Sequence, residues 1–222
     1  MAGLKTVGPT ETVDFVRVDA ALCREAGKLG TATLHEAAGK IGALPSAIKP
    51  VAPPFRFSGP AFTIHSPPID NLWLHRALAA AKPGDILVAY VSGFYEAGYW
   101  GEIMSTAAKA SGLGGLVIDG CVRDGQALAE NGFPVFARGL CIQGTGKDFG
   151  ARGWLNAPVP MGDVVVHAGD LIVGDGDGVV AIPRLNVVEA IKASIKRDSD
   201  EAAIMARLRK GEATMDVYGW NR

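Results

Sequence analysis

The sequence predicts an α/β domain in which helices and strands form layers around one core. Two observations point to this class. Helical and strand patterns are mixed along the chain without a regular βαβ repeat, and the predicted strands are short, with several closely spaced hairpins towards the end. With 222 residues, 48% of them hydrophobic, the chain can bury one full core. We expect a single domain over residues 1–185 and a C-terminal helical extension over residues 186–222.

The charge balance of the sequence favours a small molecule as the binding partner. The 22 basic and 23 acidic residues form no long run of like charge, so we expect no nucleic-acid partner and no membrane partner. The three cysteines, Cys23, Cys121 and Cys141, lack metal-finger spacing, which argues against a disulfide scaffold or a structural zinc site. The start of the sequence has no apolar signal-peptide core, and we expect a cytoplasmic protein.

The first part of the chain reads as two helices followed by strands. Residues 13–29 carry apolar positions at helical spacing, which predicts a helix ending near Gly27 or Gly30. Thr33 and Glu36 form a capping-box pattern at the start of a second helix. For Glu36, this capping role and a role in a site both remain open. After a proline-rich segment, one or two strands are expected between Phe55 and Ile64.

The middle of the chain alternates helices and buried strands. Asp70 can cap a helix that runs through Ala81, where Lys82, Pro83 and Gly84 end it. Asp85 to Val91 follows as a strand without polar alternation, which predicts cover on both faces. A helix then opens at Gly101 and runs to about Ser111, with Gly112 as a C-cap candidate. The free amides at the start of this helix are suited to binding an anion.

The stretch from Gly115 to Asp124 organises the chain. The apolar residues 116–118 form a predicted buried strand that ends at an Asp-Gly turn, and the turn is followed by Arg123 and Asp124. An acid beside a permanently charged guanidinium offers a metal ligand and an anion clamp together. Taken alone, the two residues would more often form an ordinary surface pair on a turn.

Several elements follow this stretch. A short helix at 126–130 and a strand at 133–137 lead to the loop 144–147, whose Thr145 and Lys147 either face an anion or belong to a flexible glycine-rich turn. The acidic segment 175–178 favours a hairpin turn over a calcium loop, because the distal Glu of an EF-hand is absent. Residues 186–211 predict a charged helix with a solvated or subunit-facing surface.

Four segments together resemble one family. They are Gly101-Glu102, the run 107–115, the segment Asp119 to Asp124, and Asp175 to Gly178. The sequence resembles the divalent-metal-dependent class II pyruvate aldolases that cleave 4-hydroxy-4-methyl-2-oxoglutarate and 4-carboxy-4-hydroxy-2-oxoadipate. Their superfamily also contains the regulator of ribonuclease activity A. The similarity covers about residues 25–185 and is strongest from 98 to 138.

The resemblance implies a three-layer ββα sandwich of the swivelling-domain type, assembled as a homotrimer or homohexamer with active sites between subunits. It implies a Mg²⁺ or Mn²⁺ cofactor and a small 2-oxo acid substrate. Asp124 would bind the metal directly and Arg123 a substrate oxygen. The remaining implied site residues fall into three sets. The amides of Gly101, Glu102, Ile103 and Met104 would bind the substrate carboxylate, Thr145 and Lys147 would line the pocket, and Glu102, Glu36 and a neighbouring subunit's Glu201 would hold metal-bound waters.

The family pattern has Asp where this chain has Glu102, a side chain one methylene longer, and this difference weakens the assignment of a substrate. The implied reaction is retro-aldol cleavage to pyruvate, which leaves as an enolate whose charge the site must stabilise. Decarboxylation of oxaloacetate passes through the same enolate, so we expect both activities. The alternative is a non-catalytic oligomer that binds and inhibits a ribonuclease. A methyltransferase role, assigned to some relatives, is set aside because no glycine-rich cofactor loop follows a first strand.

Overall fold

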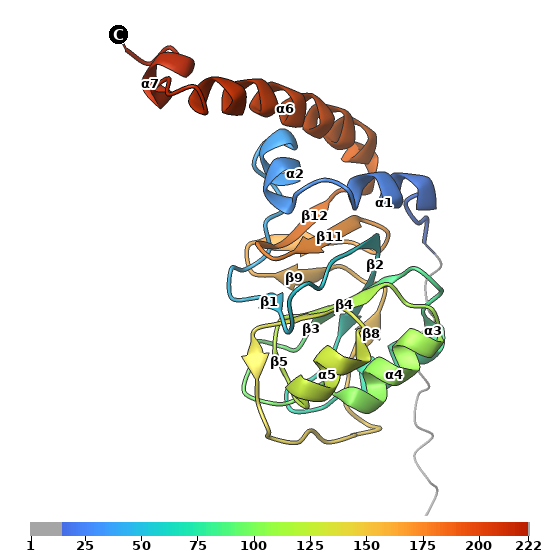
Figure 1. The fold of residues 1–222 in the computed structure, drawn as a ribbon. Helices are drawn as coiled ribbons and strands as arrows, with labels where there is room; N and C mark the ends of the chain where they lie inside the picture. The colour runs from blue at the N-terminus through green and yellow to red at the C-terminus, as the bar shows by residue number, and fades with distance from the viewer. Residues whose placement is uncertain (1–14, 222) are drawn as a thin grey trace, which may run out of the picture.

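The computed structural model describes residues 15–221, which form a mixed α/β fold with a long C-terminal helix (Figure 1). Residues 1–14, including Val13 of the first predicted helix and the segment assessed for a signal peptide, lie outside the described residues. The helices are α1 (Ala20–Ala26), α2 (Thr31–Ala37), α3 (Leu72–Ala80), α4 (Glu102–Ala110), α5 (Gly125–Asn131), α6 (Val187–Leu208) and α7 (Thr214–Val217), with a 3₁₀ turn at Arg184–Asn186.

The strands of the described residues form one large sheet and two small ones. The large sheet has the order β1-β6-β4-β3-β2-β11-β12, with β8 paired to β2, while β9 pairs with β10 and β5 with β7. The strands are β1 (Lys49–Pro50), β2 (Phe57–His65), β3 (Ile86–Tyr90), β4 (Gly115–Ile118), β5 (Cys121–Val122), β6 (Val135–Ala137), β7 (Gly139–Leu140), β8 (Trp154–Leu155), β9 (Val159–Met161), β10 (Val164–Val166), β11 (Leu171–Asp175) and β12 (Gly178–Ile182).

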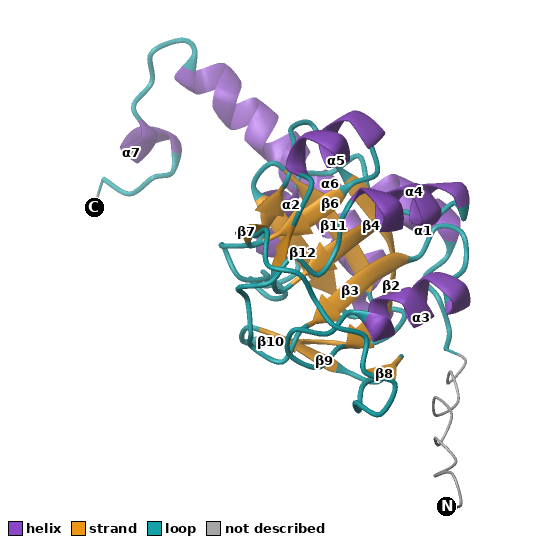
Figure 2. Cartoon of the chain, turned by 90° about the horizontal axis from the view of Figure 1, so that it is seen from below, coloured by secondary structure: helices purple, strands orange, loops and turns teal. Residues whose placement is uncertain are grey.

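The centre of the large sheet is parallel, and its edges are antiparallel. Strands β2, β3, β4 and β6 run parallel to one another, whereas β11 pairs antiparallel with both β2 and β12. Figure 2 shows helices packed around these strands. The parallel order brings the carboxyl ends of β3 and β4 to one end of the molecule, where the loops after them can meet.

Both faces of the parallel strands are buried, as the sequence predicts for residues 85–91. Alternate residues enter two cores, because successive side chains of a strand point to opposite faces. Leu87 and Ala89 pack into a core shared with α3, α4 and α5, while Ile86 and Val88 pack into a second core on the opposite face. A third core joins α1, α2 and the start of α6 to β11 and β12.

The start of α2 corrects one prediction. The helix begins at Thr31 with Gly30 as its N-cap and has no side-chain cap, so the capping box of Thr33 and Glu36 is wrong. Instead, Asp175 accepts hydrogen bonds from the Thr31 amide at 2.9 Å and hydroxyl at 2.7 Å. Burial by itself raises the pKa of Asp175, but these bonds and the Asp177 amide lower it overall. A long-range acceptor thus replaces the local cap.

Most other predicted elements are confirmed, with ends displaced by a few residues. Helix α1 ends at Gly27, the strand at 116–118 is β4, and the acidic segment 175–178 is the turn of the β11–β12 hairpin. Helix α3 begins at Leu72, whose amide donates to Asp70 Oδ1 at 2.9 Å. The mixed α/β class is confirmed, while the three-layer arrangement of the swivelling type stays a prediction.

The first part of the C-terminal helix α6 packs on the body of the protein, and its second part projects from it. Val187, Ala190, Ile191 and Ser194 at its start are buried, and the helix lies along α2 before it extends away from the body (Figures 1 and 2). Among residues 15–221, no helix is both long enough and apolar enough to cross a membrane.

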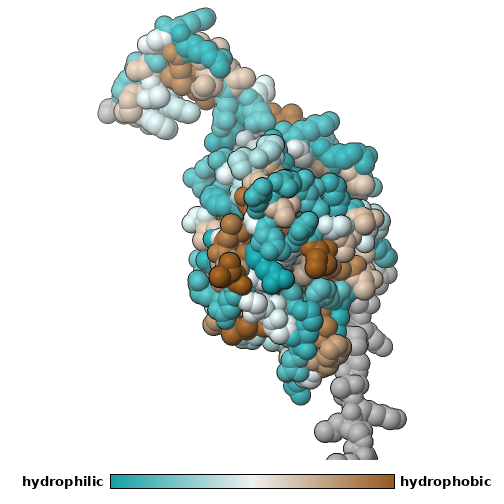
Figure 3. Space-filling view, turned by 60° about the horizontal axis from the view of Figure 1, so that its bottom comes forward, coloured by the Kyte–Doolittle hydropathy of each residue, from teal (hydrophilic) through white to brown (hydrophobic). Residues whose placement is uncertain are grey.

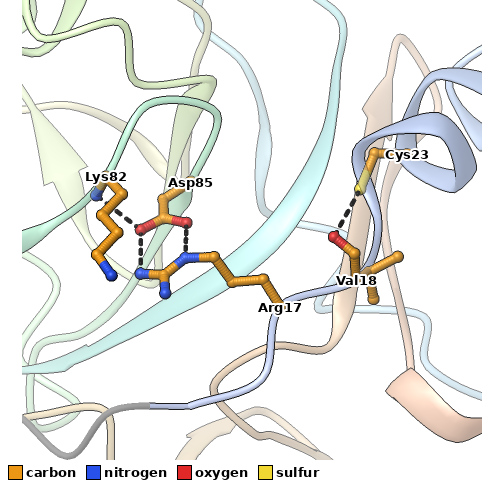
Figure 4. A network of polar contacts seen from close by, with 5 residues as sticks. All are labelled: Arg17, Val18, Cys23, Lys82 and Asp85. Carbon is orange, nitrogen blue, oxygen red and sulfur yellow. Dashed lines mark hydrogen bonds and ion pairs between the residues drawn. The ribbon is translucent and has the colours of Figure 1, made fainter.

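A buried ion pair fixes the segment before α1 to the sheet (Figure 4). Arg17 donates from Nε and Nη2 to the carboxylate of Asp85, at 2.7 and 2.8 Å, and the Lys82 amide donates to the same carboxylate at 2.9 Å. On the other side of this segment, burial, assisted by Asp19, raises the pKa of the Cys23 thiol to about 11. That thiol lies 3.9 Å from the Val18 carbonyl oxygen, to which it donates.

Candidate active site

A largely buried ion pair between Asp119 and Arg138 holds the loop after β4 in place. Asp119 follows the strand and is buried, and its Oδ1 accepts a hydrogen bond of 2.6 Å from Arg138 Nε. The guanidinium of Arg138 also lies 3.9 Å from the centre of the Tyr95 ring. Sequence reasoning missed Arg138, because it lies 19 positions after Asp119 and only the fold brings the two together. The pair fixes the base from which the site residues project.

Arg123 and Asp124 project from the end of this loop beside the start of α4. The Arg123 amide donates to the Trp100 carbonyl at 2.8 Å, and Arg123 Nε lies 3.7 Å from Asp124 Oδ2. The Glu102 amide donates to the same Oδ2 at 3.2 Å. Both side chains are nearly half exposed, so the ion pair is solvated and contributes little to stability. Their position suits ligand binding better than structural support.

The backbone of Asp124 has an unusual conformation. Its φ of 62° and ψ of 39° lie in the left-handed region, which costs most residues energy and is best tolerated by Gly, Asn and Asp. Asp124 is the N-cap residue of α5, yet its side chain makes no capping bond to that helix. The left-handed turn directs the carboxylate towards α4 instead. Strained backbone of this kind is concentrated at functional sites.

Two glycines make the close approach possible. A Cβ atom at Gly101 would lie 2.4 Å from Asp124 Oδ2, and one at Gly98 would lie 3.1 Å from the Arg123 Cβ and 2.5 Å from the Cys141 carbonyl oxygen. Real side chains do not come this close without a shift of the neighbour. A side chain at position 98 would clash with the backbone of Cys141, and one at position 101 would displace the Asp124 carboxylate. The backbone φ of −156° at Gly101 is open to any residue, so the constraint there is one of space.

A cavity of about 240 Å³ lies in front of these groups. It brings together most of the residues that the sequence assigns to the site: Gly101, Ile103, Met104, Arg123, Asp124, Thr145 and Lys147. Glu102 is exposed, and its side chain is not among the lining groups. Its amide is already engaged by Asp124, whereas the amides of Ile103 and Met104 lie in the first turn of α4 and remain suited to an anion.

The cavity is also lined by two residues that sequence reasoning missed, Asn71 and His75. Asn71 donates from Nδ2 to the Tyr99 carbonyl at 2.9 Å, which ties the start of α3 to the segment before α4. Burial lowers the pKa of His75, with Lys147 acting in the same direction and Asp70 opposing it. The i and i+4 spacing of residues 71 and 75 on a predicted helix was the available signal, since it places both on one face.

Glu36 and Glu201 lie together, but not in this cavity. Arg197 on α6 lies between them, with Nη1 3.8 Å from Glu36 and Nε 2.8 Å from Glu201. Figure 1 shows α2 and α6 at the opposite end of the molecule from α4 and α5. Within one chain neither acid reaches Asp124, so their role in holding metal-bound waters stays a prediction that depends on a neighbouring subunit.

Fold and site together define an α/β protein in which a carboxylate, a guanidinium and a helix N-terminus surround one cavity. The chain belongs to the RraA-like family, described as Aldolase/RraA, whose pattern it matches over residues 31–181.

Known relatives agree with this assignment. A protein of Halalkalibacterium halodurans named "Putative 4-hydroxy-4-methyl-2-oxoglutarate aldolase" is 34% identical over 173 residues, which cover 78% of this chain and 81% of that protein. Among solved structures, an uncharacterized protein of Pseudomonas syringae superposes with a TM-score of 0.80 at 27% identity, covering 94% of this chain and 99% of the other. RraAS2 of Streptomyces coelicolor, described as an unusual member of the RNase ES inhibitor RraA family, gives 0.73 at 27% identity, covering 87% and 100%.

Proposed function

We propose that this protein is a divalent-metal-dependent carbon-carbon lyase. It cleaves a 4-hydroxy-2-oxo dicarboxylic or tricarboxylic acid, such as 4-hydroxy-4-methyl-2-oxoglutarate or 4-carboxy-4-hydroxy-2-oxoadipate, to pyruvate and a second oxo acid, and it also decarboxylates oxaloacetate. The observation that carries the proposal is the arrangement of Arg123, Asp124 and the start of α4 around one cavity. The names of the relatives support the same class of reaction.

The donor set fits a hydrated Mg²⁺ or Mn²⁺ ion. Asp124 presents a half-exposed carboxylate whose Oδ1 accepts no hydrogen bond within residues 15–221. No cluster of three or more His, Cys, Asp or Glu side chains suited to a metal occurs in that range. A closed cage is not required, because magnesium keeps several waters and binds proteins through one or two carboxylates. When bound, the ion supplies Lewis-acid polarisation of the 2-oxo carbonyl group.

The chain's own groups bind and orient the substrate. The amides of Ile103 and Met104, at the positive end of the α4 dipole, hold the carboxylate beside the carbonyl. Arg123 donates to the oxygen on which negative charge develops as the carbon-carbon bond breaks. Lys147 and Thr145 line the same cavity and offer a cation and a hydroxyl to the remainder of the acid.

Assembly completes the proposal. We expect a homotrimer or homohexamer of the layered swivelling-domain type in which residues 186–222 pack on a neighbour and bring Glu201 near its site. The part of the chain that projects from the body has apolar surface (Figure 3). Its exposed apolar side chains support this assembly, namely Met205, Met215, Tyr218 and Trp220. The protein is expected to act in the cytoplasm, without a nucleic-acid or membrane partner.

The test is pyruvate release from 4-hydroxy-4-methyl-2-oxoglutarate and from oxaloacetate, with magnesium and after complete chelation. Metal-dependent release from both acids is expected. If fresh protein with magnesium releases pyruvate from neither acid, the lyase proposal fails.

A second candidate is a non-catalytic oligomer that inhibits a ribonuclease. It is favoured by the similarity to RraAS2 along the whole of that structure. The same assay separates the two functions, because an inhibitor has no turnover. A ribonuclease assay with added protein, in which cleavage slows with increasing amounts of this chain, would then support the second function.

A further inference from the structure

His75 is a cavity group without an assigned task. It lies on α3, is partly buried, and lines the same cavity as Arg123 and Asp124. Its ring makes no hydrogen bond to any other residue of the described chain, 15–221. An imidazole that lines a binding cavity and lacks a protein partner is available to a ligand.

The other histidines differ in this respect. The sequence has four, and the other three lie outside this cavity with polar partners. His35 Nδ1 is 2.9 Å from the Ile41 carbonyl, His65 Nε2 is 2.9 Å from the Ser92 hydroxyl, and His167 Nδ1 is 3.7 Å from Asp170. The free ring of His75 is therefore specific to its position and not a general property of histidines in this fold.

The proposed reaction needs a group that His75 can supply. Cleavage of a 4-hydroxy-2-oxo acid requires removal of the hydroxyl proton, and Arg123 and the Lys147 ammonium carry no lone pair to accept it. Asp124 is engaged by the Glu102 amide and is the proposed metal ligand. Of the side chains that line the cavity, the neutral imidazole is the one chemically suited to accept a proton and return it.

We propose that His75 is the general base for carbon-carbon cleavage, an inference that rests on the proposed lyase function. A ring nitrogen takes the proton of the 4-hydroxyl group as the oxygen forms the new carbonyl. The bond between C3 and C4 breaks, and its electron pair moves to the 2-oxo group as the pyruvate enolate. The imidazolium then gives the proton to C3, which completes pyruvate and restores the neutral ring.

The surroundings favour the neutral ring in the resting state. Burial is the main cause that lowers the pKa of His75, and the Lys147 ammonium adds to it. Asp70 opposes this effect, but its carboxylate is already engaged by the amides of Leu72 and Asp148, at 2.9 and 2.6 Å. The elements packed against α3 are β2, α4 and β8. The charged groups that act on the His75 ring are thus Lys147 and Asp70.

The two activities provide the discriminating experiment. Oxaloacetate loses carbon dioxide directly, so no hydroxyl proton has to be removed and decarboxylation does not need this base. In His75→Gln, kcat for aldol cleavage should fall at least about 100-fold, while oxaloacetate decarboxylation stays within about threefold of wild type. His65→Gln, at a partly buried histidine outside the cavity, is the matched control and should leave both activities unchanged.

His75→Phe, which keeps an aromatic ring at this position, gives an independent variant in case the first does not fold. Exchange of the pyruvate methyl protons with D₂O, followed by NMR, should also be lost in both variants, because exchange reverses the C3 protonation step. Equal loss of both activities, or no selective loss of cleavage, overturns the role of His75. If wild-type protein has neither activity, the proposed function itself fails, and the role of His75 with it.

Discussion

The Glu102 amide donates a hydrogen bond of 3.2 Å to Oδ2 of Asp124, and this contact joins the first residue of α4 to the N-cap of α5. One carboxylate oxygen is thereby fixed, while Oδ1 accepts no hydrogen bond from the residues described. The geometry of the proposed metal ligand is therefore set by how closely α4 can approach it. This dependence can be tested at the glycine before Glu102.

Gly101→Ala should displace the Asp124 carboxylate, because the new Cβ would lie 2.4 Å from Oδ2. We expect metal-dependent pyruvate release to fall at least about 100-fold, as misplacement by about 1 Å does in other sites. The control is Gly144→Ala, which lines the same cavity but has no atom within 4 Å of the added carbon. Similar losses in both variants would contradict the proposed crowding of Asp124.

Removal of the metal should abolish turnover and leave the fold intact, since residues 15–221 contain no group of three or more His, Cys, Asp or Glu side chains that could form a structural metal site. Circular dichroism before and after chelation measures the fold, and pyruvate release after addition of Mg²⁺ or Mn²⁺ measures recovery. Asp124→Asn should lose both activities even with excess metal. Full turnover after rigorous chelation would exclude the metal mechanism.

Substitution of Arg123 should affect the chemical step more than binding. Arg123→Lys keeps a cation but loses the planar fork, so kcat should fall more than KM rises. Loss of one donor to a developing oxyanion costs about 3 kcal/mol, or a rate loss of about a hundredfold or more. Arg123→Ala should be worse. Steady-state kinetics on both acids provides the measurement, and near-normal kcat in Arg123→Ala would make this loop structural.

The pH dependence should differ between the two reactions. His75 acts as a base only when neutral, and burial, assisted by Lys147, lowers its pKa below the usual value of a free imidazole. Cleavage should therefore persist to a lower pH than the usual pKa of an imidazole allows and then fall as the ring becomes protonated, whereas decarboxylation should lack this acid limb. Profiles of kcat for both acids on the same protein test this. An identical limb in both reactions would point to a group other than His75.

The ion pair before α1 should contribute measurably to stability. Arg17→Ala leaves the fully buried Asp85 carboxylate without its cation, which should reduce the free energy of unfolding by about 3 kcal/mol. Lys192→Ala, which removes an exposed pair with Glu189, should cost less than about 1 kcal/mol. Denaturant titration of both variants gives the comparison. Equal small losses would show that Arg17 does not anchor this segment.

Local patterns predicted much of the fold. Apolar runs predicted β3 and β4, because strands that are buried on both faces show no alternation of polar and apolar residues. The Asp-Gly turn after β4 marked the loop that contains the candidate site residues Arg123 and Asp124. The start of α2 was mispredicted because Asp175, 144 residues away, supplies the acceptor that a local cap would supply. Arg138 was missed for the same reason, and for His75 the spacing from Asn71 indicated only a shared helix face, not the cavity that this face lines. Their importance comes from neighbours that only the tertiary fold provides.

The left-handed backbone of Asp124 limits which residues can occupy this position. Most side chains would add conformational strain there in addition to any change in chemistry, and Glu, although it keeps the charge, would be among them. Asn is tolerated in this region and has nearly the same shape. Substitutions at position 124 that avoid strain are thus restricted to a narrow set of residues by the backbone itself, before any demand of the metal or substrate applies.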